Sequence, residues 1–167
     1  MIQIAKKEFE LPRGLAAETK VWIYQAEREL SNKEVAEMTA LLNTFVSDWA
    51  AHGKNLQADF RIFFNRFICL FVDETSHGAS GCSIDSSVHF IQQLERTFSV
   101  QLMKRTQVAY LIDNEIQTIE MNELSDLAKK GQINSSTLVF NNLVKTMGEM
   151  EKAWILPAGE SWHARLL

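Results

Sequence analysis

A short segment rich in glycine and serine carries the densest set of reactive side chains in the chain. It reads Ser-His-Gly-Ala-Ser-Gly-Cys-Ser-Ile-Asp from residue 76 to residue 85. The segment leads into a predicted helix, and backbone N–H groups at a helix start lack intrahelical partners and carry partial positive charge. We therefore expect Gly81, Cys82, Ser83 and Asp85 to border a site for a phosphate, sulfate or carboxylate.

The same segment permits thiol chemistry. Partial positive charge at a helix start favours the thiolate of Cys82, and His77 or His89 would then carry the proton. A purely structural role is the third alternative, with Ser83 capping the helix and Asp85 complementing its dipole. The residues leave these alternatives open, and they favour a binding protein over an enzyme.

Three further polar residues extend the predicted ligand-binding set. Asn141 and Asn142 directly follow a predicted strand at 137–140, where amides either complete a turn or bind a ligand. His163 lies in Ser-Trp-His-Ala-Arg, residues 161–165, and reaches a site only if this C-terminal segment packs on the fold.

Charge and composition exclude several partners. The 167 residues carry 17 Lys and Arg against 21 Asp and Glu, a net charge of −4, which argues against nucleic-acid binding. Spacings typical of metal sites are missing from the sequence, so we predict no metal and no cofactor. The sequence has no apolar run of about 20 residues, so no membrane partner is expected. Cys69 and Cys82 form no disulfide framework, which favours a cytoplasmic protein.

The elements that would position these residues begin with a strand and a helix. The apolar run Val21–Tyr24 predicts a buried strand. Ser31 and Glu34 have the spacing of a capping box, which predicts the start of a long amphipathic helix that ends near Gly53.

An aromatic-rich hairpin and a second helix follow. The hairpin spans 58–74, turns at Asn65–Arg66, and has a second strand, Phe67–Val72, that we expect to be buried on both faces. The helix begins near Ser83, and its predicted inward face carries Ile84, Val88, Ile91, Leu94 and Phe98. Strands at 107–112 and 115–120 then flank a turn at Asp113–Asn114.

The order strand, helix, strand, strand, helix, strand predicts an α+β fold with a ferredoxin-like split βαβ sheet covered by two helices. We assign residues 1–20 to an N-terminal leader, 21–113 to this core, and 114–167 to a small α+β extension packed on it within one globular unit. Open edges of such sheets commonly pair, which leaves a homodimer open.

Several motifs resemble a family of short bacterial proteins of unknown activity that often carry the label "ABC transporter ATPase". They are Gly-Ala-Ser-Gly-Cys-Ser-Ile-Asp from residue 78, Val-Phe-Asn-Asn-Leu-Val from residue 139, and Ser-Trp-His-Ala-Arg from residue 161. The sequence lacks the Gly-x-x-x-x-Gly-Lys-Ser/Thr loop on which such ATPases hold phosphates, so we do not expect that activity. The expected function is binding of a small molecule or anion, or of a protein partner, with an enzyme centred on Cys82 as the alternative.

Overall fold

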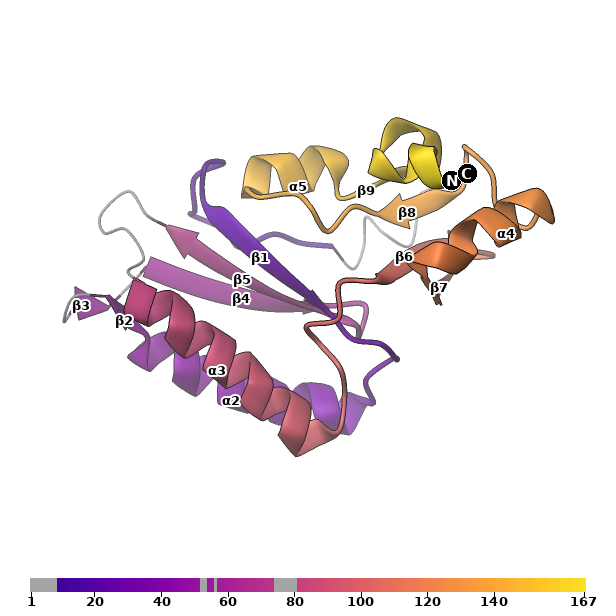
Figure 1. Cartoon of the computed structure of the whole chain (residues 1–167). Coiled ribbons are helices and arrows are strands. Elements are labelled where there is room, and N and C mark those ends of the chain that lie inside the picture. Colours follow the sequence, from indigo (N-terminus) through magenta and orange to yellow (C-terminus); the bar gives the residue numbers. More distant parts are fainter. Residues whose placement is uncertain (1–8, 52–53, 56, 74–80) are drawn as a thin grey trace.

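The computed structural model describes residues 9–51, 54–55, 57–73 and 81–167. His77 and most of the predicted loop lie outside the described residues, as do the first eight residues of the predicted leader. Helices and antiparallel sheets are combined in one chain, which confirms the predicted α+β class (Figure 1). None of the described helices has both the length and the apolar composition that crossing a bilayer requires.

The first sheet is built around a strand that is buried on both faces. β5 (Phe67–Asp73) lies between β1 (Lys20–Gln25) and β4 (Gln57–Phe63), and both pairings are antiparallel. Residues 67–72 are completely buried, which confirms the prediction from their uninterrupted apolar sequence. The register places Gln25, at the end of β1, opposite Phe67, at the start of β5.

A tight turn joins β4 to β5. Phe64 and Asn65 have φ values of 55° and 50° there, and two consecutive positive φ values are typical of a type I′ hairpin. The turn lies one residue earlier than the sequence predicted. Two short strands before this hairpin, β2 (Ala50–Ala51) and β3 (Lys54–Asn55), pair only with each other.

Two helices cover one face of the first sheet, α2 (Asn32–Asp48) and α3 (Gly81–Phe98) (Figure 1). The predicted capping box at the start of α2 is confirmed. The Ser31 hydroxyl accepts from the Glu34 N–H at 3.2 Å, and the Glu34 carboxylate accepts from the Ser31 N–H at 2.8 Å. Two backbone donors that the helix itself cannot pair are satisfied in this way.

The buried face of α3 begins one residue earlier than its apolar pattern predicts. Ser83 and Ser87 are buried, whereas Ile84 is 42% exposed. The indole N–H of Trp49 donates to the Ser83 carbonyl at 2.8 Å, and a small side chain at position 83 allows this close approach. The inner face of α3 is therefore Ser83, Ser87, Ile91, Leu94 and Phe98.

The second sheet comes from the later part of the chain. Its order is β7-β6-β8-β9, with β7 (Glu115–Glu120), β6 (Gln107–Ile112), β8 (Leu138–Phe140) and β9 (Ile155–Pro157), and all pairings are antiparallel. The predicted turn between β6 and β7 is confirmed, with positive φ at Asp113 and Asn114. Short helices connect and follow these strands: η1 (Met121–Glu123), α4 (Leu124–Lys129), α5 (Met147–Ala153), η2 (Ala158–Glu160) and η3 (Trp162–Leu166).

The predicted ferredoxin-like arrangement is not confirmed, because β6 leaves the first sheet. A fourth strand of that arrangement would pair with β1, whereas β6 pairs with β7 and β8. Part of the β1 edge is instead occupied by the segment before α5. The Val21 N–H donates to the Lys145 carbonyl at 3.0 Å, and the Met147 N–H donates to the Thr19 carbonyl at 2.9 Å. β7 and β8, which belong to the predicted extension at 114–167, thus pair with β6, which the prediction assigned to the core at 21–113.

The face of the first sheet that α2 and α3 leave open packs on this second half. Phe67 and Phe71 of β5 share a core with Phe140 of β8 and with Trp154, which follows α5. The Phe67 and Phe140 rings lie 4.6 Å apart, and Trp154 meets both of them edge-on. This aromatic core holds the end of β1 close to the end of β8, where the candidate site lies.

Candidate functional site

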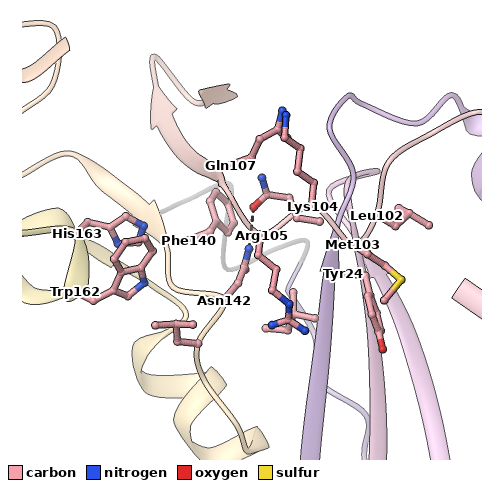
Figure 2. A pocket seen from close by; sticks show the side chains of 13 residues that line it. Tyr24, Leu102, Met103, Lys104, Arg105, Gln107, Phe140, Asn142, Trp162 and His163 are labelled. Atoms are coloured by element: carbon pink, nitrogen blue, oxygen red, sulfur yellow. Dashed lines mark hydrogen bonds between the residues drawn. The ribbon is translucent and has the colours of Figure 1, made fainter. Parts of the chain in front are cut away.

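A pocket opens where four segments meet: the end of β1, the connection from α3 to β6, the end of β8 and the start of η3. Its volume is about 90 Å³. Figure 2 shows Trp162 and His163 on one side, Tyr24 and Met103 on the other, and Asn142 between them. Residues separated by more than a hundred positions in the sequence therefore share one cavity.

A chain of side-chain hydrogen bonds forms one wall of this pocket. The indole N–H of Trp154 donates to Asn142 Oδ1 at 2.9 Å, and Asn142 Nδ2 donates to Gln25 Oε1 at 2.8 Å. An indole nitrogen can only donate, so Asn142 must turn its oxygen toward Trp154 and its nitrogen toward Gln25. Gln25 must then turn its oxygen toward Asn142, which leaves its nitrogen as a donor of fixed polarity.

That donor has no partner. Gln25 is 7% exposed, and its Nε2 is buried without a hydrogen bond. A buried donor left unpaired costs about 1–3 kcal/mol of stability, so each case calls for an explanation. In the described part of the chain, four buried side-chain atoms are unpaired in this way, and three of them belong to residues that line the pocket: Gln25 Nε2, Trp162 Nε1 and His163 Nε2.

His163 is completely buried and stacks on its neighbour Trp162, with ring centroids 3.8 Å apart. Its Nδ1 lies 2.6 Å from the Ser161 hydroxyl, and its Nε2 has no partner. Burial lowers the pKa of His163 to about 4, so the imidazole is neutral at pH 7. Arg165 also lies over the Trp162 ring, with its Cζ 5.5 Å from the ring centroid.

Two neighbouring basic residues line the pocket, although the chain as a whole has a net negative charge. Lys104 and Arg105 line it, whereas no Asp or Glu among the described residues does so. Lys104 is paired with Glu120, which also accepts from Thr106. Arg105 is exposed and has no carboxylate partner in the described part of the chain. Burial raises the pKa of Tyr24, so its hydroxyl stays neutral near pH 7.

The structure brings two of the sequence-predicted residues together. Asn142 and His163 both line the pocket. Asn141 has a local role, because its Nδ2 donates to the Ala153 carbonyl at 3.2 Å and its Oδ1 accepts from the Leu143 N–H at 3.3 Å.

The predicted residues at the start of α3 lie away from this pocket. Gln25 pairs with the first residue of β5, whereas α3 follows the other end of that strand (Figure 1). Gly81, Cys82 and Asp85 are exposed there, and Ser83 is buried beneath Trp49. None of these four residues lines the pocket.

His89 is exposed on the same helix as Cys82. Seven residues separate them, a rise of about 10 Å along a helix, which is too far for a direct proton transfer between their side chains. His89 therefore does not serve as the proton carrier for the Cys82 thiol. The other proposed proton carrier, His77, lies outside the described residues.

Sequence reasoning missed Gln25, Arg105 and Trp162. Gln25 carries a weak signal, because it is a polar residue that directly ends an apolar strand. No feature of the sequence indicated Arg105, because it lies in the segment between α3 and β6, and its position there does not predict which cavity it lines. The described residues hold no group of three or more His, Cys, Asp or Glu that could bind a metal ion.

No family model, curated protein or solved structure matches this chain, so the resemblance noted above stays a prediction.

Proposed function

We propose that this protein binds a small anion in the pocket between the two sheets. One observation carries the proposal: the side chains around the pocket present hydrogen-bond donors that have no acceptor. Gln25 Nε2 and Trp162 Nε1 are unpaired, and the polarity of both is fixed. A ligand that meets them must bring acceptor atoms.

The charge of the lining points to the same class of ligand. Arg105 contributes a positive charge that no carboxylate of the described residues neutralises, and the lining adds no negative charge. An anion would pair with Arg105 and relieve the unpaired donors, each of which costs about 1–3 kcal/mol. Because those donor atoms are buried, the lining side chains must shift slightly as the ligand enters.

A binding experiment with Arg105 variants tests the proposal. Acetate, butyrate, phosphate and sulfate would be titrated at constant ionic strength, with calorimetry and the indole ¹H–¹⁵N resonance of Trp162 as readouts. We expect at least one of these anions to bind and to move that resonance. Arg105→Ala should weaken binding about tenfold, because it removes a charge-assisted contact.

Arg96→Ala is the matched control. Arg96 is also an exposed arginine, but it lies on α3 outside the pocket, so its removal should leave the affinity within about twofold. Equal effects of the two substitutions would mean that only net charge matters, and failure of all four anions to bind would also overturn the proposal.

A further inference from the structure

We infer that the ligand of this pocket is a small monocarboxylate with a short apolar body, selected over phosphate-like dianions. The inference rests on the proposed function and adds the class of anion. Three features carry it: the number of unpaired charges, the shape and number of the donors, and the division of the pocket into polar and apolar parts.

The pocket offers one uncompensated positive charge. The ammonium group of Lys104 is engaged by Glu120, whose second oxygen accepts from Thr106 at 2.9 Å. His163, buried and hydrogen-bonded to Ser161, adds no charge at pH 7. Arg105 is therefore the one lining residue whose positive charge no carboxylate of the described residues balances. A second negative charge on the ligand would be desolvated without a partner, which is strongly unfavourable.

The donors match a carboxylate in shape and number. The planar guanidinium of Arg105 can give two parallel N–H bonds to the two oxygens of a carboxylate. Trp162 adds one N–H, and the unpaired amide nitrogen of Gln25 carries two. A carboxylate has about four lone-pair sites in one plane, so these donors are enough to pair all of them, whereas a tetrahedral dianion would keep further acceptors unpaired.

The remaining lining is apolar. Leu102 and Phe140 are each 2% exposed and form the inner apolar surface, whereas Leu143 is 59% exposed and lies at the opening. The volume of about 90 Å³ is small for a ligand pocket, so it suits a carboxylate with a short body better than a large ligand. A short hydrocarbon body would then extend along the apolar lining toward Leu143.

Three ligands with the same propyl body separate these features. Butyrate carries one negative charge on a plane, and butyramide has the shape of butyrate without its charge. Propylphosphonate carries a tetrahedral headgroup that becomes a dianion only at alkaline pH, so the three ligands are compared at alkaline pH. We expect butyrate to bind the wild-type protein at least tenfold more tightly than either analogue, and more tightly than acetate, which lacks the body.

Arg105→Lys sharpens the test because it keeps the positive charge and removes the planar donor pair. This variant should lose most of the preference for butyrate over propylphosphonate, whereas Arg96→Lys should keep it. Arg105 is exposed, so both variants are expected to fold.

The outcomes separate the two proposals. Tighter binding of propylphosphonate, with the same sensitivity to Arg105→Ala, would overturn the monocarboxylate inference and leave anion binding standing. Equal binding of butyrate and butyramide, insensitive to Arg105→Ala, would overturn both, as would no binding of any of these compounds.

Discussion

Two tryptophans in different regions of the molecule differ in whether their indole N–H has a hydrogen-bond acceptor. In the region covered by α2 and α3, the indole N–H of Trp49 donates to the Ser83 carbonyl at 2.8 Å. At the pocket, the indole nitrogen of Trp162 is also buried, and its N–H has no partner. The same functional group is thus satisfied where the chain only builds structure and unsatisfied beside the cavity.

Other polar groups follow the same division. At the start of α2, Ser31 and Glu34 pair each other's backbone N–H groups, and Arg28 donates to the Glu34 carboxylate at 2.8 Å and to the Phe98 carbonyl at 3.0 Å. At the pocket wall, the chain of bonds from Trp154 through Asn142 ends at a Gln25 nitrogen without an acceptor. Among the described residues, Thr19 Oγ1 is the one unpaired buried side-chain atom away from the pocket, whereas three such atoms belong to residues that line it, where a ligand can pair them.

The largest expected effect comes from Trp154→Phe. The substitution removes the donor that fixes the half-buried Asn142, leaves Asn142 Oδ1 without this donor, and reduces the volume of a completely buried ring. The free energy of unfolding should fall by about 3 kcal/mol, measured by urea denaturation. A loss below about 0.5 kcal/mol would mean that the bonds along the wall do not depend on Trp154.

The second effect is a pH dependence centred on His163. Its folded pKa of about 4 is below the unfolded value of 6.5, so between these values the unfolded chain binds more protons. The contribution of His163 is complete above about pH 6.5 and is lost as the pH falls toward 4. Between pH 7.5 and pH 5 the wild-type protein should lose about 2 kcal/mol more stability than His163→Gln.

The two proteins would be compared by urea denaturation at several pH values, because carboxylates titrate equally in both and cancel in the difference. Parallel stability profiles would show that His163 is not held neutral by its surroundings. His163 would then no longer count among the unusual polar groups that distinguish the pocket from the region covered by α2 and α3.

A smaller effect is expected in the region where polar groups are paired. Ser31→Ala removes the hydroxyl that caps α2 and should lower the free energy of unfolding by about 1 kcal/mol. Ser31→Asp is the matched control, because aspartate caps helices as well as serine does and should restore most of the loss. An unchanged stability in Ser31→Ala would mean that the cap contributes nothing to the satisfied region.

The smallest effect should come from Trp162→Phe. This change removes an N–H that lacks a partner and also part of the ring that stacks on His163. The gain from removing an unpaired donor opposes the loss of packing, so the stability of the ligand-free protein should stay within about 0.5 kcal/mol of wild type. Trp49→Phe makes the same chemical change to a paired N–H and should cost about 1–3 kcal/mol. Equal costs at the two positions, both measured by urea denaturation, would remove the comparison on which the proposed function rests.

Local signals in the sequence predicted local structure well. The capping box at Ser31 and Glu34, the buried strand at 67–72 and the turn at Asp113–Asn114 each depend on neighbouring residues, and all three are confirmed. The predicted buried face of α3 was one residue out at its start, because the prediction considered apolar residues alone. In the structure, the Ser83 carbonyl accepts a hydrogen bond from Trp49, and Ser83 is buried.

Local sequence signals did not predict which distant strands pair or which distant residues line the pocket. The order of the elements does not say that β6 pairs with β8 rather than β1, because that choice depends on the segment at Lys145, which already holds the β1 edge. The candidate site also depends on contacts between residues that are distant in the sequence. Asn142 and His163 were recognised as polar residues in suitable places, but only the fold joins them to Gln25 and Arg105.

The hydrogen bond between Gln25 and Asn142 joins residues 117 positions apart, and this has a consequence for biosynthesis. Ribosomes deliver β1 long before β8, and a loop of that length closes late because its entropic cost comes before any contact compensates it. A nascent or truncated chain that ends before Asn142 therefore has no pocket, even with α2 and α3 already folded on their sheet. Ligand binding would thus report that the chain has been synthesised and folded at least as far as η3.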